Sequence, residues 1–271
     1  FITMKFLTAI IATMGLTAGL YSCQSANKAS EQPEEQLYMF TSFHEPADEG
    51  LRFLYSEDGI HWDSIAGTWL KPMLGQNIMR DPSIVVGPDS TYHLVWTIAW
   101  KGDTGFCYAS SKDLVNWEHH PNAIEPNGLG SVFSGSCVVD KENTAGFGKD
   151  EIIALYTSAG INQMQSLAHS GDNGETFSIY PGNPILTLES EARDPNMFWN
   201  EESKEWNLLL AHALDHEMLV FTSPDLKEWT LQSAFGKGIG AQGGVWECPD
   251  LMQLPVNGTD EKKWVLICNL N

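Results

Sequence analysis

The chain has 271 residues, and its 35 acidic and 15 basic side chains give it a formal net charge of −20. Because phosphate-binding surfaces need clustered lysine and arginine side chains, and no basic run follows Lys5, this balance excludes a nucleic acid as partner. The ten tryptophans suit a neutral sugar better, since sugar rings can stack on aromatic faces while polar groups fix their hydroxyls. For the charge alone, the solubility of an exported protein is the simpler explanation.

Residues 1–23 are predicted to be an export signal of the lipoprotein type. Lys5 supplies the positive start, and the apolar run over residues 6–20 is too short for a membrane span. The segment Leu20-Tyr21-Ser22-Cys23 is similar to a bacterial lipoprotein cleavage site, after which Cys23 would carry the lipid. An ordinary secretory signal with an incidental cysteine is the alternative. We expect an exported protein, in the periplasm or on the outer membrane or cell surface, that meets the membrane only through this lipid.

Residues 24–36 are polar and have too few apolar side chains to bury themselves, which predicts a tether. The folded domain is therefore expected to cover residues 37–271, a length that fits one large all-β domain. The four cysteines in it contain no Cys-x-x-Cys pair, and each lies in an apolar, strand-like setting, so we predict neither a zinc site nor a disulfide. They are Cys107, Cys137, Cys248 and Cys268.

A turn signature, Ser-x-Asp-x-x-x-Trp, recurs along the domain. Its copies span residues 56–62, 111–117 and 223–229, and a looser copy spans residues 170–177. The intervals of about 50 to 60 residues match the four-stranded blade of a β-propeller. Short apolar runs rich in β-branched and aromatic residues precede the signatures and are typical of strands. The pattern predicts an all-β fold, a β-propeller.

Acidic residues stand near the starts of several repeat units. These starts lie near Asp81, Ser134, Asp194 and Glu247. Since the first strand of every propeller blade lines the central channel, residues at equivalent starts should converge there although they are distant in sequence. Arg80-Asp81-Pro82 or Arg193-Asp194-Pro195 alone is weak evidence, because aspartate before proline also starts turns. Together with Trp246-Glu247-Cys248-Pro249-Asp250, these motifs predict a carboxylate cluster of the kind that glycoside hydrolysis needs.

From Trp117 onward the chain resembles glycoside hydrolase family 32, the levanases, inulinases and invertases. The matching segments are residues 133–136, 138–140, 143–147, 165–170, 193–195 and 245–251. The resemblance implies a five-bladed propeller that hydrolyses fructans or fructosides such as levan, inulin and sucrose with retention and without a cofactor. It implies Glu247 as general acid/base, Asp194 as transition-state stabiliser and Asp81 as nucleophile. This assignment agrees with the two carboxylates that an oxocarbenium-like transition state requires.

The surroundings of Asp81 depart from the family pattern. Residues 78–84 read Ile-Met-Arg-Asp-Pro-Ser-Ile where the family carries Trp-Met-Asn-Asp-Pro-Asn-Gly, and Thr97 stands where the family usually has a glutamine. The region from Leu37 to about Trp117 is more similar to family 43-like propellers, which invert and act mostly on arabinosides and xylosides. Carboxyl groups about 5 Å apart would indicate retention, and a gap of about 6.5 to 9.5 Å would indicate inversion.

Further residues are expected to bind the substrate. By the same resemblance, Phe133, Ser134 and Arg193 line the sugar pocket. Trp100 and Trp246 are candidates for stacking on a sugar ring, although a propeller tryptophan more often packs between blades. A metal site is not expected: His212 and His216 share a face, but a zinc ion needs a third protein ligand at least.

The family pattern usually continues through another blade and a β-sandwich, whereas this sequence ends after what is predicted to be the second strand of the Glu247 blade. We therefore expect a fragment; the alternative is that the unit from Leu37 to Met79 supplies the missing blade. Besides a retaining fructan hydrolase, two functions stay open: a non-catalytic sugar-binding propeller lipoprotein and an inverting arabinosidase or xylosidase. The expected partner in each case is an oligosaccharide or polysaccharide.

Overall fold

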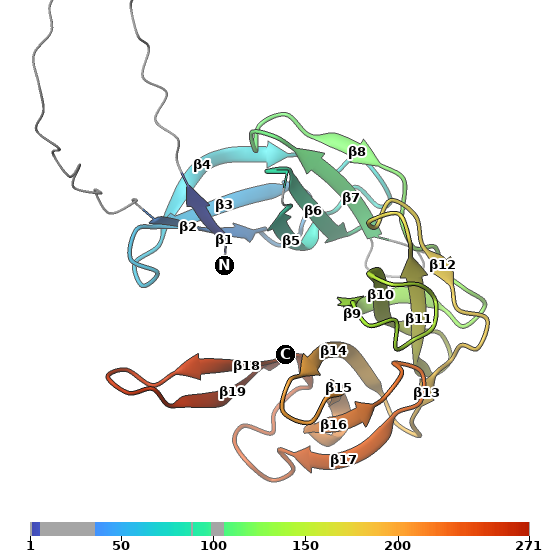
Figure 1. The fold of residues 1–271 in the computed structure, drawn as a ribbon. Helices are drawn as coiled ribbons and strands as arrows, with labels where there is room; N and C mark the ends of the chain where they lie inside the picture. The colour runs from blue at the N-terminus through green and yellow to red at the C-terminus, as the bar shows by residue number, and fades with distance from the viewer. Residues whose placement is uncertain (1, 6–35, 88, 99–105, 271) are drawn as a thin grey trace, which may run out of the picture. The chain divides into compact units, whose positions relative to one another are not determined.

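The computed structural model describes residues 2–5, 36–87, 89–98 and 106–270, which form five β-sheets and one short 3-10 helix (Figure 1). The first sheet contains β1 (Ile2–Lys5), β2 (Gln36–Ser42), β3 (Leu51–Ser56) and β4 (Asp63–Leu70). The second contains β5 (Arg80–Val86), β6 (Tyr92–Thr97), β7 (Phe106–Ser111) and β8 (Glu118–His120). The third contains β9 (Ser131–Asp140), β10 (Glu151–Ala159), β11 (Gln163–Ser170), β12 (Ser178–Ile179) and β13 (Leu186–Thr187).

The fourth sheet contains β14 (Ala192–Asn200), β15 (Glu205–His212), β16 (Glu217–Ser223) and β17 (Thr230–Phe235), with the helix η1 (Ala213–Asp215) between β15 and β16. The fifth contains β18 (Trp246–Pro255) and β19 (Lys262–Leu270). Sheets of four strands that follow the chain order, with short turns, are the blades of a propeller. This confirms the predicted all-β propeller class.

The predicted five blades are not all present among the described residues, which form four blades. Four sheets have four or five strands, whereas the fifth is the β18–β19 hairpin alone.

The N-terminal predictions fall mostly outside the described residues, because residues 6–35, including Cys23, are not among them. Residues Ile2–Lys5, within the predicted export signal, form β1, which pairs with β2. The strand β2 begins at Gln36, one residue before the predicted start of the domain. Among the described residues, no helix has the length and apolar character needed to cross a membrane.

The chain divides into two compact units. The first comprises the described residues up to Ile98 together with Ala109–His120, and the second comprises residues 106–108 and 121–270. Asp81 belongs to the first unit, whereas Asp194 and Glu247 belong to the second.

The turn signatures fold as the sequence predicts. In the first copy, Ser56 Oγ accepts the N–H of Gly59 at 2.8 Å, and Asp58 Oδ1 accepts the N–H groups of Ile60 and His61 at 2.8 Å. The copies that begin at Ser111 and Ser223 repeat the pattern through their own aspartates. Because serine and aspartate bond the turn backbone directly, each signature closes the connection between the last two strands of a blade.

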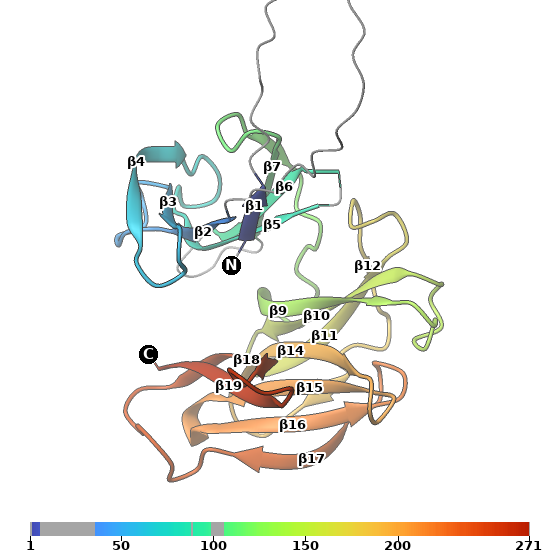
Figure 2. The ribbon, with the colours of Figure 1, turned by 60° about the vertical axis from the view of Figure 1, so that its left-hand side comes forward.

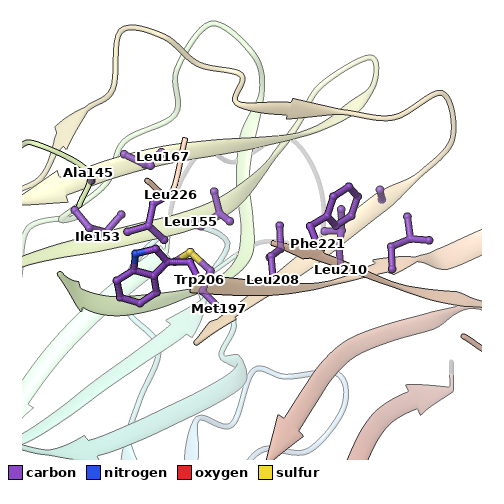
Figure 3. Close-up of a cluster of buried hydrophobic side chains, with 12 residues drawn as sticks. Ala145, Ile153, Leu155, Leu167, Met197, Trp206, Leu208, Leu210, Phe221 and Leu226 are labelled. Carbon is purple, nitrogen blue, oxygen red and sulfur yellow. The ribbon is translucent and has the colours of Figure 1, made fainter. Parts of the chain in front are cut away.

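The core of the second unit is built on the two faces of β15. Leu208 and Leu210 point into a buried cluster shared with the third sheet (Figure 3), whereas Leu209 and Ala211 pack against the fifth sheet. This alternation follows from the two-residue period of a strand, and it explains why residues 208–211 are apolar without a break. Figure 2 shows the β18–β19 hairpin beside β14 and β15, the placement that this second cluster stabilises.

Candidate active site

The first strands of three sheets carry the same β-bulge. In each, the pairing with the next strand shifts register around a residue that precedes a proline and has a positive φ. These residues are Asp81 in β5 (φ 50°), Asp194 in β14 (φ 61°) and Cys248 in β18 (φ 48°). Proline has no N–H to give to a neighbouring strand, so a bulge is where a strand tolerates it.

The shared bulge defines equivalent positions in the three strands. Arg80, Arg193 and Glu247 occupy the first position, and Asp81, Asp194 and Cys248 occupy the second. A left-handed backbone at a non-glycine residue costs about 1–3 kcal/mol and is concentrated at functional sites, where it aims a side chain. The candidate acid Glu247 is therefore not equivalent to the two aspartates but stands one residue earlier in its strand.

Arg193 links the two strands that carry the carboxylates of the second unit. Its side chain is buried, with 7% of the residue exposed. The Nε atom donates to Glu247 Oε1 at 2.9 Å, and Nη1 donates to Glu191 Oε2 at 2.8 Å and to Gln163 Oε1 at 3.2 Å. Burial works to lower the pKa of Arg193, but the contacts with Glu191 and Glu247 outweigh it and leave the pKa raised. The guanidinium therefore stays charged and fixes the orientation of the Glu247 carboxyl group.

Asp194 follows Arg193 in β14 and is also buried, with 8% of the residue exposed. Its Oδ2 atom accepts the backbone N–H of Cys248 at 2.9 Å and lies 3.6 Å from the Cys248 Sγ donor. Burial raises the pKa of Asp194, and the negative charge of Glu247 acts in the same direction, whereas the Cys248 amide and Arg193 oppose both. The bulge of β18 thus positions a donor for the aspartate of β14.

A buried polar chain supports the Asp194 bulge from the third sheet. The backbone N–H of Asp194 donates to Thr157 Oγ1 at 3.1 Å, and this hydroxyl donates to Gln165 Oε1 at 2.8 Å. Gln165 Nε2 in turn donates to the carbonyl of Ala192 at 2.8 Å. Sequence reasoning missed Thr157 and placed Gln165 only within the family-like segment 165–170, without a role in the site. A threonine in the mostly apolar strand β10 was the available signal. The bonds of this polar chain satisfy the amide that the bulge removes from the strand ladder.

The predicted binding residues have different surroundings. Phe133 and Ser134 lie exposed in β9, opposite the register shift between Tyr156 and Ser158. Trp246 is only 5% exposed and packs in the cluster with Leu209 and Ala211, so it is a packing residue and its ring is not available for stacking. Trp100 lies outside the described residues.

Asp81, in the first unit, lines a groove of about 430 Å³ between the end of β2 and the start of β5. Its side chain is exposed. The equivalent of Arg193, Arg80, has its Nε atom 3.6 Å from Oε1 of Glu45, a residue whose side chain is 54% exposed. The groove thus offers a carboxylate that a ligand can reach.

The arrangement of the second unit can perform acid–base chemistry. Glu247 keeps 24% of its side chain exposed, and a buried arginine orients it beside a second carboxylate, a combination that can protonate a leaving oxygen and stabilise positive charge. Among the described residues, no group of three histidine, cysteine, aspartate or glutamate side chains is placed to hold a metal ion. The four cysteines beyond Cys23 are free thiols.

Comparison with known proteins identifies relatives of this chain. Residues 70–271 match the family model of the glycosyl hydrolases family 32 N-terminal domain. The chain is 45% identical over 202 residues to a levanase from Bacillus subtilis (strain 168), which covers 70% of this chain and 29% of the levanase. It is 38% identical over 232 residues to an extracellular exo-inulinase from Aspergillus niger, which covers 72% of this chain and 43% of that enzyme.

Solved structures of a fructofuranosidase and an exo-inulinase are also similar to this chain. A fructofuranosidase from Schwanniomyces occidentalis complexed with fructosylnystose has a TM-score of 0.63 and 34% identity, over 73% of this chain and 41% of that chain. An exo-inulinase from Aspergillus awamori has a TM-score of 0.62 and 36% identity, over 74% of this chain and 45% of that chain. The chain thus spans less than half the length of these relatives. The match to the family model begins at the last residue of β4.

Proposed function

The chain belongs to glycoside hydrolase family 32, and we propose that it hydrolyses the glycosidic bonds of fructans or fructosides such as levan, inulin and sucrose. The observation that carries the proposal is the pairing of two adjacent strand bulges. One presents Asp194 and the other Glu247, and Arg193 joins them. The names of the relatives, a levanase and exo-inulinases, support fructan as the substrate class.

The proposed mechanism is a double displacement. In the first step, the Glu247 carboxyl group gives its proton to the glycosidic oxygen while the Asp81 carboxylate bonds to the anomeric carbon and the leaving group departs. In the second step, Glu247 takes a proton from water, whose oxygen replaces Asp81 on that carbon and releases the sugar with its configuration retained. Asp194 and Arg193 hold the sugar, and the Asp194 carboxylate stabilises the positive charge that develops on its ring.

Two finer features belong to the proposal. We propose that β18 and β19 are the first strands of a fifth blade, because they repeat the bulge that opens the other blades. We also propose that the enzyme is exported, which agrees with the extracellular relative from Aspergillus niger, and that it is held at the membrane through a lipid on Cys23.

A second candidate function is an inverting pentosidase. It is favoured by the residues around Asp81. Arg80 and Ser83 stand where the family segment Trp-Met-Asn-Asp-Pro-Asn-Gly has its two asparagines. In that case Asp81 would act as a base on water, and arabinosides would replace fructosides as substrates. A non-catalytic sugar-binding protein is the third candidate, for the same reason.

The test is sugar release from levan, inulin, sucrose and a panel of arabinosides, with Glu247→Gln as the variant. We expect fructose release by the wild type and a loss of about 10²–10⁴-fold in the variant, the usual contribution of a general acid. Thermal unfolding of both proteins shows that the variant is folded. Release of arabinose with inverted configuration, followed by NMR, would support the pentosidase. Sugar binding without turnover by a cooperatively folded wild type would indicate the binding protein.

A further inference from the structure

One guanidinium group holds two glutamates in the second unit. Arg193 Nε donates to Glu247 Oε1 at 2.9 Å, and Arg193 Nη1 donates to Glu191 Oε2 at 2.8 Å. The same Nη1 atom donates to Gln163 Oε1 at 3.2 Å. Glu191 immediately precedes β14, and Gln163 is the first residue of β11. The cation is therefore shared by two carboxylates, of which the proposed reaction uses only Glu247.

The shared cation matters for the proton of Glu247. A general acid must carry its proton when the substrate arrives. A cation at hydrogen-bond distance favours the ionised form of a carboxyl group, and water screens this effect poorly where the cation is buried. Arg193 has only 7% of its residue exposed, so alone it would oppose the protonated form of Glu247. A second negative charge on the same guanidinium offsets this effect, and Glu191 supplies one.

Other ionisable side chains lie on the elements near the start of β18, where Glu247 stands. Those of the neighbouring elements are Asp194 in β14, His212 in β15, Asp215 in η1, His216, Glu217 in β16 and Lys237 after β17. Those of β18 itself are Cys248 and Asp250. The strand β19 places the uncharged Asn269 opposite Glu247. The acids of η1 and β16 pair with His212, whereas Glu191 shares the guanidinium that holds Glu247.

We propose that Glu191 is a positioning residue that balances the charge of Arg193, so that Glu247 keeps its proton until the leaving oxygen takes it. Gln163 completes the seat of the guanidinium without adding a charge. The inference rests on the proposed function for the role of Glu247. Because 49% of the Glu191 side chain is exposed, solvent screens part of its charge, and its influence on Glu247 is moderate.

The experiment uses two isosteric substitutions of opposite sign at one nitrogen atom. Glu191→Gln removes a negative charge beside Arg193 Nη1, and Gln163→Glu adds one there. Glu189→Gln is the matched control, because Glu189 is exposed and also precedes β14 but is not bonded to Arg193. For the full chain and each variant, kcat/KM is measured against pH with the best substrate among levan, inulin and sucrose. Thermal unfolding shows which variants are folded.

The alkaline limb of the kcat/KM profile reports the loss of the proton from the general acid. We expect this limb to move to lower pH by about half a unit in Glu191→Gln and to higher pH by about as much in Gln163→Glu. Both movements should shrink in high salt, and Glu189→Gln should show neither. A limb that stays in place or moves in the opposite direction, in either folded variant, overturns the proposal, since a purely structural role would lower activity without these movements.

A second measurement does not depend on turnover. NMR of protein whose glutamates carry ¹³C at the side-chain carboxyl group follows the titration of Glu247 directly, and Glu247→Gln assigns the signal. We expect Glu191→Gln to move this titration to lower pH, as it moves the alkaline limb. The same movement in a wild type that hydrolyses none of the substrates would support the charge balance while overturning the proposed reaction. An unmoved titration in folded Glu191→Gln would overturn the charge balance whether or not the enzyme is active.

Discussion

The two units present the same Arg-Asp-Pro bulge in different surroundings. In the second unit, Arg193 and Asp194 are buried, and the arginine bonds to the glutamate of the next strand bulge. In the first unit, Asp81 is exposed in a groove, and Arg80 lies near a glutamate that is half exposed. The local sequence therefore sets the backbone of the bulge, whereas the neighbouring strands decide whether its carboxylate is buried and prearranged or open to a ligand.

The largest expected effect on activity comes from replacing either aspartate by asparagine. We expect Asp194→Asn and Asp81→Asn each to lower kcat/KM by roughly 10³-fold, since each removes a charge that stabilises the transition state or forms the bond. The stabilities should differ. Asp81→Asn should leave the melting temperature unchanged because its carboxylate is exposed, whereas Asp194→Asn should raise it at pH 7.

The sign of this difference follows from the pKa of Asp194, which burial raises in the folded state. A carboxyl group with a raised pKa stabilises the fold below the unfolded pKa, and this contribution is lost as pH rises through the folded pKa. An asparagine at position 194 carries no charge, so the variant avoids the cost of burying an ionised carboxylate. The gain in the free energy of unfolding should therefore be present at pH 7 and absent at pH 3. Unfolding curves at both pH values measure it. A lower melting temperature of Asp194→Asn than of the wild type at pH 7 would contradict the claim that burying the ionised carboxylate destabilises the fold.

The second comparison concerns the two arginines. Arg193→Ala leaves Glu247 and Glu191 without their shared cation. Because these glutamates keep 24% and 49% of their side chains exposed, we expect a cost of about 1.5–3 kcal/mol, the usual value for a hydrogen bond to a charged group. Arg80→Ala removes an ion pair with a half-exposed glutamate, and such pairs contribute at most about 1 kcal/mol. Urea unfolding of both variants measures the difference. Lys204→Ala, which removes an exposed pair with Glu201, is the control. Equal losses in the free energy of unfolding for Arg193→Ala and Arg80→Ala would show that the burial of the arginine does not set its contribution to stability.

The third comparison concerns the hydroxyl group that supports each bulge. Thr157→Val leaves the buried N–H of Asp194 without its acceptor, at a cost of about 1–3 kcal/mol. Thr41→Val removes a donor from the partly buried carbonyl of Pro82, and the cost should be about 0.5–1.5 kcal/mol. The serine variants at both positions keep the hydroxyl group and should restore stability in urea titrations. If Thr41→Val lowered the free energy of unfolding more than Thr157→Val, burial would not decide how much each hydroxyl group stabilises its bulge.

The features that the sequence predicted are those set by local chemistry. Ser56 and Asp58 close their turn with bonds to residues within three positions, so the signature alone reveals the turn. The run over residues 206–210 is typical of a strand, and the burial of its leucines on both faces follows from the two neighbouring sheets. The proline after Asp194 suggested only a turn, although a proline inside a strand is also a signal of a bulge.

The features that the sequence did not predict depend on contacts between distant segments. The bond from Arg193 to Glu247 spans 54 positions, and the bond from Asp194 to Thr157 spans 37. Neither can be found without the strand order and register. Trp246 shows the same limit, because an indole can be a binding platform or a core residue, and only its placement against Leu209 and Ala211 decides between them.

The smallest expected effect tests the donor that β18 supplies to Asp194. The Cys248 amide contributes the shorter bond to Asp194 Oδ2, at 2.9 Å, and the thiol lies at 3.6 Å. Cys248→Ser replaces a weak S–H donor by a hydroxyl, which stabilises the ionised carboxylate and should lower the pKa of Asp194. The acid limb of the kcat/KM profile should therefore move to lower pH, while kcat/KM at pH 7 changes by less than about threefold. Cys137→Ser, in the neighbouring β9, is the matched control and should leave the acid limb in place. An acid limb that moves to higher pH would show that the thiol does not act as a donor to Asp194, and that the Cys248 amide and Arg193 alone oppose the burial of this carboxylate.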